Sequence, residues 1–122
     1  TGYETGASFL NQIGLSTQIP KYKKYATNAF NQFGGKENKK LMVIIQKPRI
    51  HITEDNYLYL QILDAITNKD KVTFDVPQPE KIILDYINAR KLDFIKLVGY
   101  AGKYYNKKTQ LRISEIAVAG SL

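Results

Sequence analysis

The stretch TGYETGASFLNQIGLSTQIP, residues 1–20, decides how the chain begins. Small and apolar residues recur through it at the spacing of one helix face, at Tyr3, Ala7, Leu10 and Gly14. Gly14 readily adopts the left-handed conformation that ends a helix, and Leu15 follows it where a C-cap contact is needed. Pro20 prevents a return to helix and favours extended backbone before it. The stretch therefore predicts one amphipathic helix, a sharp turn, and a strand that starts near Lys21.

Beyond this stretch the chain divides into an early β-rich part and a late helical part. The run Leu41–Ile45 is the most apolar in the chain and predicts a central strand, joined to a strand at 21–27 in a β-hairpin that spans residues 21–47. Ile50–Ile52 predicts a further short strand. Helix starts are indicated by cap or first-turn residues at Thr53, Pro79, Asp93 and Thr109. This order predicts an α+β fold, in which a small, mostly antiparallel sheet near the N-terminal half packs against several helices in the C-terminal half.

Length and composition restrict the class of protein. The 122 residues are 43% hydrophobic and predict a single domain over 1–122. No apolar run approaches the roughly 20 residues of a bilayer span, and the residues show no leader pattern, so we expect a cytoplasmic protein. The absence of cysteine excludes thiol catalysis, disulfides and thiolate metal sites.

The net charge of +7 is concentrated in residues 21–49, where eight cations face one acid, Glu37. One of these eight cations is Lys36. We predict that the other seven bind nucleic-acid phosphates: Lys21, Lys23, Lys24, Lys39, Lys40, Lys47 and Arg49. The alternative is that these lysines lie on solvated strand edges and only maintain solubility. Four tyrosines lie close to lysines in the sequence: Tyr22, Tyr25, Tyr104 and Tyr105. This combination is typical both of base stacking and of protein interfaces.

A reactive centre is not evident in the sequence. His51 is the only histidine, and Glu54 and Asp55 near it are better explained as first-turn residues of a helix. No carboxylate pair has a spacing typical of a metal site, and no phosphate-binding glycine loop is present. Asp64 lies in a strongly apolar helix predicted over 54–67, where it is either a buried polar anchor or, as we predict, on the wet edge. We therefore expect no catalysis, no metal and no cofactor.

Two separated segments resemble one protein family. Thr1-Gly2, Phe9-Leu10-Asn11 and the run GLSTQIP at 14–20 are similar to the "TGxxALNxLGLSTQxP" segment of AbiEi-type antitoxins, which belong to type IV (AbiE) toxin–antitoxin systems. Further along, the residues ATN at 26–28, ITEDN at 52–56 and LQILDAI at 60–66 resemble the family's "ATN" and "ITEENxxxLQLLDAI". The resemblance covers residues 1–70 and continues beyond them only in helical pattern.

The resemblance implies a function for the chain. Such a protein neutralises a cognate nucleotidyltransferase toxin without a stable complex, and it represses its own operon by binding DNA, in defence against phage through abortive infection. This chain would correspond to the C-terminal antitoxin domain, with a winged-helix DNA-binding domain upstream of Thr1. The alternative is a protein-interaction module whose basic hairpin docks an acidic partner.

Overall fold

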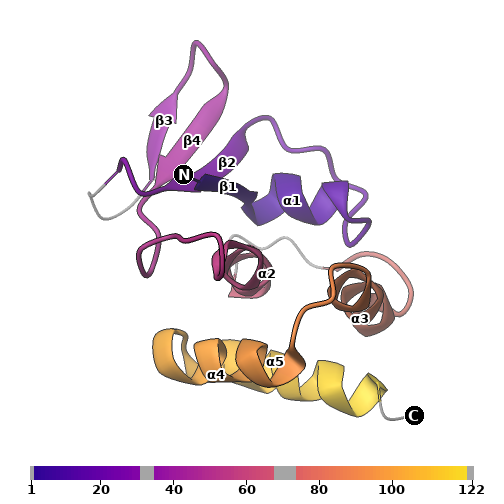
Figure 1. The fold of residues 1–122 in the computed structure, drawn as a ribbon. Helices are drawn as coiled ribbons and strands as arrows, with labels where there is room; N and C mark the ends of the chain where they lie inside the picture. The colour runs from indigo at the N-terminus through magenta and orange to yellow at the C-terminus, as the bar shows by residue number, and fades with distance from the viewer. Residues whose placement is uncertain (1, 31–34, 68–73, 121–122) are drawn as a thin grey trace.

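Residues 2–30, 35–67 and 74–120 are described by the computed structural model, and they form four strands and five helices. The elements are, in chain order, β1 (Gly2–Thr5), α1 (Gly6–Gln12), β2 (Lys23–Thr27), β3 (Lys36–Asn38), β4 (Val43–Gln46), α2 (Tyr57–Thr67), α3 (Pro79–Ala89), α4 (Phe94–Tyr104) and α5 (Lys107–Gly120). Figure 1 shows them in three layers, with the sheet and α1 above, α2 and α3 in the middle, and α4 and α5 below.

The α+β class is confirmed, and the sheet is mixed. Its strand order is β1-β2-β4-β3, with β1 antiparallel to β2, β2 parallel to β4, and β3 antiparallel to β4. The predicted hairpin between the strand at 21–27 and the apolar run is wrong. The turn at 39–42 joins β4 to β3 instead, and it reverses the chain so that β4 runs in the same direction as β2.

The predicted helix over residues 1–20 is wrong in its first turn. Gly2–Thr5 forms the edge strand β1, in which Tyr3 and Thr5 are buried while Gly2 is exposed. This alternation is typical of a strand with one face on the core. Gly6 has a φ of +65°, a backbone conformation that glycine adopts at little cost, so the chain turns there from strand into α1.

The motif at 14–20 has a structural explanation. Gly14 has a φ of +87°, and the Leu15 N–H donates to the Leu10 carbonyl at 2.9 Å, so α1 ends as predicted with Leu15 packed into the core. The Thr17 N–H and hydroxyl both donate to the Asp75 carboxylate at 2.8 Å, which ties this turn to the segment before α3. These hydrogen bonds lower the pKa of Asp75.

Helix α2 is the centre of the core. It packs against β1, α1, α4 and α5, and its buried residues point in several directions: Tyr59, Leu60, Ile62, Leu63 and Ala65. The prediction of a helix buried against more than one partner is confirmed. Thr53 and Asn56 bond reciprocally in the turn before it, through Asn56 N–H to Thr53 Oγ1 and Thr53 N–H to Asn56 Oδ1. No helix in the described residues is long and apolar enough to cross a membrane.

The remaining predicted starts are correct for two helices and wrong for one. Pro79 opens α3, and the Asp93 carboxylate accepts the Ile95 N–H at 2.9 Å at the start of α4. Thr109 does not cap α5. Asn106 does so, by accepting the Thr109 N–H at 3.0 Å.

The predicted strand at Ile50–Ile52 is also absent. The side chain of Asn28 takes the place of a neighbouring strand there, because its amide bonds both the N–H of Ile52 at 2.8 Å and the carbonyl of Ile52 at 2.9 Å.

Replacing Lys91 by glycine should stabilise the protein. Lys91 follows the C-cap of α3 with a φ of 55°, a conformation that costs an L-residue about 1 kcal/mol. We expect Lys91→Gly to raise the free energy of unfolding by about 0.5–1 kcal/mol in urea titration. The matched control, Lys81→Gly within α3, should lower it by about 1 kcal/mol. Equal effects of the two substitutions would contradict this explanation.

Candidate nucleic-acid interface

The predicted lysines around β2 are divided between the two faces of the sheet. Lys23 and Lys24 are consecutive strand residues, so their side chains project to opposite faces. Lys23 is exposed, whereas Lys24 is half-buried and its aliphatic carbons lie against Gly6. Lys21 precedes the strand, and its Nζ lies 5.7 Å from the centroid of the Tyr22 ring. The three ammonium groups therefore do not form one surface.

The hairpin of β3 and β4, which we call the β3–β4 ribbon (Lys36–Gln46), carries the next group of cations. It extends beyond the rest of the molecule at the top of Figure 1. Lys36 on β3 and Lys39 and Lys40 in the turn are all exposed, and Lys47 is exposed immediately after β4. Glu37 is the one acid within the ribbon. The ribbon thus presents a concentrated positive charge to solvent.

The apolar run of the ribbon is less buried than predicted. Only its last three residues belong to β4, which lies between β2 and β3, and their side chains are half-buried. Leu41 and Met42 lie in the turn, with 67% and 42% of their surfaces exposed. The reason is that the ribbon extends past the helices, so no second layer covers its tip.

Arg49 is separate from the ribbon and lies against the end of α4. Its Nη1 donates to the Tyr104 carbonyl at 3.3 Å, and its guanidinium carbon lies 4.5 Å from the centroid of the Tyr105 ring. A cation at this position satisfies a carbonyl that the helix end leaves without an intrahelical partner. Arg49 therefore stabilises the end of α4 while its side chain remains exposed.

A second basic and aromatic surface lies on α4, over the buried Tyr59 of α2. Tyr59, Tyr100 and Tyr104 follow one another with ring centroids 5.4 and 6.2 Å apart. Lys96 Nζ lies 5.8 Å from the Tyr59 centroid, and Lys103 Nζ lies 5.4 Å from the Tyr104 centroid. We call these five residues the α4 strip.

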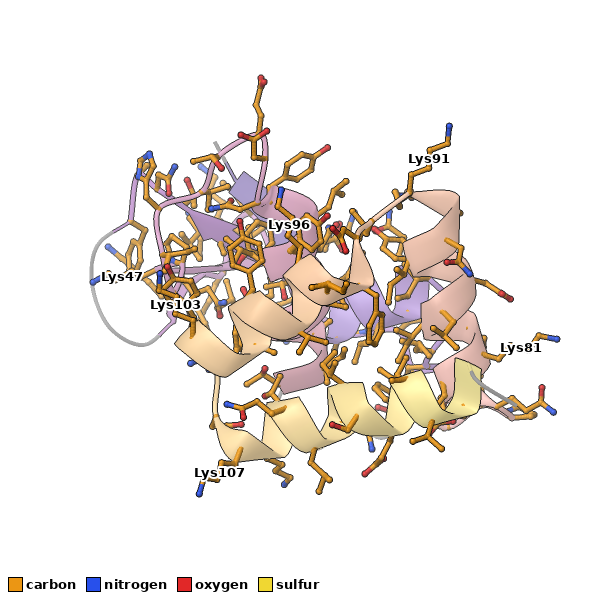
Figure 2. All side chains as sticks on the ribbon, turned by 60° about the horizontal axis from the view of Figure 1, so that its bottom comes forward. Lys47, Lys81, Lys91, Lys96, Lys103 and Lys107 are labelled. Carbon is orange, nitrogen blue, oxygen red and sulfur yellow. The ribbon has the colours of Figure 1, made fainter. Side chains whose placement is uncertain are left out.

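The sequence prediction missed most of the α4 strip. Lys96, Tyr100 and Lys103 follow the i, i+4, i+7 spacing of one helix face, and this spacing is the signal that could have identified it. Figure 2 shows Lys103 and Lys47 on the same side of the molecule, where α4 ends. Lys81 and Lys91 lie on the opposite side in that view.

Asp64 is the polar anchor of the core, and its predicted place on the wet edge of the helix is wrong. The Tyr105 hydroxyl donates to Asp64 Oδ1 at 2.5 Å, and the Tyr3 hydroxyl donates to Oδ2. We call these three residues the Tyr–Asp–Tyr cluster, which joins β1, α2 and the end of α4.

The environment of the cluster changes the acidity of its members. Burial raises the pKa of Asp64, and this outweighs the two tyrosine hydrogen bonds, which lower it. The charges of Arg49 and Lys24 also lower the pKa of Asp64, to a smaller extent. Burial, together with the Asp64 charge, raises the pKa values of Tyr3 and Tyr105. Both hydroxyls therefore remain protonated donors at neutral pH.

The other polar groups in the part of the chain that the structure describes form no comparable centre. His51 is exposed, and its Nε2 lies 3.5 Å from the Asn28 amide nitrogen. Among residues 2–30, 35–67 and 74–120, no three His, Cys, Asp or Glu side chains are grouped so that they could hold a metal ion.

An open groove of ≈ 580 Å³ lies between α1, α2 and α3. Gln61 lines it, donating to the Glu4 carbonyl at 2.9 Å and accepting from the Tyr86 hydroxyl at 3.3 Å. Because these bonds engage both ends of the Gln61 amide, Gln61 joins β1, α2 and α3.

Comparisons of the chain with protein-family models, with curated proteins and with solved structures found no match.

Proposed function

We propose that this chain is a non-enzymatic antitoxin domain that contacts DNA, in a type IV toxin–antitoxin system of the AbiE kind. In this proposal it works in the cytoplasm, contributes to repression of its own operon, and counters a nucleotidyltransferase toxin without forming a stable complex with it. The sequence segments at 1–28 and 52–66 support the family, and the charged surfaces described above support the contact with DNA.

The observation that carries the DNA contact is the exposed positive charge of the β3–β4 ribbon. Lys36, Lys39 and Lys40 form no ion pair with an acid among the described residues, so their ammonium groups remain available to a polyanion. Neutralising phosphates with such groups releases counterions from the duplex, which is the main source of sequence-independent affinity. Contacts of this kind position a protein on DNA but do not select a sequence.

The α4 strip and Arg49 extend the same chemistry to a second element. Lysines that flank tyrosine rings provide charge for the backbone and flat faces for bases. The rings of Tyr100 and Tyr104 are half-buried, which leaves part of each accessible. The proposed contact therefore includes the ribbon and the end of α4.

A second candidate function is docking of an acidic protein partner. Leu41 and Met42 are exposed among lysines on the ribbon, and protein interfaces also combine an apolar centre with charged surroundings. The salt dependence of DNA binding separates the two functions.

We expect binding to a fluorescein-labelled 20-base-pair duplex to weaken steeply with salt, measured by anisotropy between 50 and 200 mM KCl. Each phosphate contact contributes about 0.9 to the slope of log affinity against log salt. The double variant Lys39→Gln/Lys40→Gln should therefore lower that slope by about 2. The control, Lys81→Gln/Lys91→Gln, removes the same charge from α3 and the residue that follows its C-cap, apart from the ribbon (Figure 1), and should leave the slope unchanged. A flat salt dependence of the wild type would favour the acidic partner.

Antitoxic activity needs its own test. The chain is co-expressed with a nucleotidyltransferase toxin of the AbiE kind, and growth is scored. Rescue of growth without co-purification of the two proteins is the expected result. Failure of rescue by soluble, folded protein would remove the neutralising role.

A further inference from the structure

The turn of the β3–β4 ribbon holds two apolar side chains in solvent. Turn residues are usually polar or glycine, yet Leu41 and Met42 occupy this one and are exposed. The turn also has a defined backbone conformation. Asn38 Oδ1 accepts the Leu41 N–H at 3.0 Å, and Met42 has a φ of 57°. An asparagine or glycine would suit that backbone better than methionine, so the apolar side chain is present against the local conformational preference.

Cations surround this apolar tip. Lys39 and Lys40 directly precede Leu41, and Lys36 lies on the adjoining strand. Proteins that bind the DNA minor groove combine lysine or arginine with an apolar wedge such as leucine or methionine, which enters between two base pairs and bends the duplex. The ribbon belongs to the four-stranded sheet, and its turn lies at one end of that sheet, on the side away from the helical layers (Figure 1). The turn can therefore reach a groove while the helical layers remain clear of the DNA.

An anionic membrane is less suited to the same tip. Binding to a lipid surface scales with the apolar area that enters it, and a helix that lies in that surface supplies a whole apolar face. The ribbon offers two side chains, and no other exposed large apolar residue of the described chain lies in its turn.

We infer that Leu41 and Met42 form a wedge that enters the minor groove of duplex DNA and bends it, while Lys39 and Lys40 hold the flanking phosphates. This inference rests on the proposed DNA contact and specifies its mode. It assigns separate tasks to neighbouring residues, because the lysines supply affinity and the wedge supplies deformation. Flexible pyrimidine–purine steps should therefore be preferred over stiff A-tracts.

The test measures bending by energy transfer between dyes at the two ends of a 25-base-pair duplex with a central TA step. Wild-type protein should raise the transfer efficiency, as expected for a bend of about 20–90°. The variant Leu41→Ala/Met42→Asn should reduce that increase at least threefold at saturating protein, with an unchanged salt slope. Asparagine tolerates the left-handed backbone at position 42, so the turn should be retained, and an unfolding temperature no lower than that of the wild type checks this.

Two comparisons make the result specific. Leu111→Ala/Val118→Ala removes exposed apolar groups from α5 and should bend DNA like the wild type. An A-tract duplex should be bent less than the TA duplex by wild-type protein.

Each remaining outcome is decisive. Wild-type protein that binds DNA with a steep salt slope but does not bend it, or a wedge variant that bends it fully, overturns the wedge and leaves the proposed DNA contact intact. Wild-type protein that does not bind the duplex overturns both. Co-sedimentation with vesicles containing phosphatidylserine that needs Leu41 and Met42, without any DNA bending, assigns the tip to a membrane instead.

Discussion

The variant Asp64→Ala should lose about 2–4 kcal/mol of unfolding free energy, a large part of the stability of a domain of this size. The substitution removes the shared acceptor of the Tyr3 and Tyr105 hydroxyls, both of which are buried. Each hydroxyl left without a partner costs about 1–3 kcal/mol. Loss of the desolvated charge offsets part of this penalty. Urea titration at pH 7, followed by circular dichroism, measures the change.

Asp64→Asn is the matched control, because it keeps the shape and one acceptor oxygen. It should lose less unfolding free energy than Asp64→Ala, and it should also change how the unfolding free energy depends on pH. The raised pKa of Asp64 means that the folded chain binds more protons than the unfolded chain just above the ordinary aspartate pKa. As the pH rises from the ordinary aspartate pKa to the raised pKa of folded Asp64, the unfolding free energy of the wild type should therefore fall relative to that of Asp64→Asn. A constant difference between pH 3 and pH 7 would contradict the described environment of Asp64.

The variant Leu60→Ala should lose about 2–5 kcal/mol, because it creates a cavity at the contact of several elements. Leu60 has 0% of its surface exposed and lies on α2, which packs on β1, α1, α4 and α5. The neighbouring elements cannot all move in to fill the space, so little of the lost packing is regained.

The control for this cavity is the same substitution at an exposed leucine. Leu111 on α5 has 62% of its surface exposed, and Leu111→Ala should change the unfolding free energy by no more than about 0.5 kcal/mol. Similar losses at positions 60 and 111 in guanidinium titration would mean that α2 is not the centre of the core.

The stability variants and the DNA-binding variants concern different parts of the molecule. Leu60 lies within the core and the half-buried Asp64 lies beside it on the same helix, whereas Lys39, Lys40 and the exposed tip of the ribbon lie outside it. Substitutions in the ribbon should therefore change binding without lowering the unfolding free energy, which allows the proposed function to be tested on folded protein.

Several features of the fold could be predicted because the residues that cause them are neighbours in sequence. Gly14 ends α1, Asp93 caps α4, and Pro79 opens α3, each through contacts within a few residues. The burial of α2 was likewise evident from apolar residues on every side of it. The concentration of positive charge is evident from the sequence too. Strand alternation also implies that Lys23 and Lys24 lie on opposite faces of β2.

The candidate site was predicted less completely. The positions of the ribbon lysines follow from the charge count, and their role in binding stays a prediction. The α4 strip was missed because its tyrosines come from α2 and α4 and meet only when those helices pack. The apolar run at 41–45 was expected to be central, and its tip is exposed because the ribbon extends past the helices.

The sequence by itself determined the α+β class, the helix ends that depend on local chemistry, the buried character of α2 and the concentration of positive charge in residues 21–49. Only the tertiary structure decided that Gly2–Thr5 is a strand, that β2 and β4 are parallel, and that Asp64 binds tyrosines 61 and 41 positions away. The physical reason is that caps and amphipathic faces depend on residues a few positions apart. Strand partners and buried polar contacts are selected by the total free energy of packing segments that are distant in sequence.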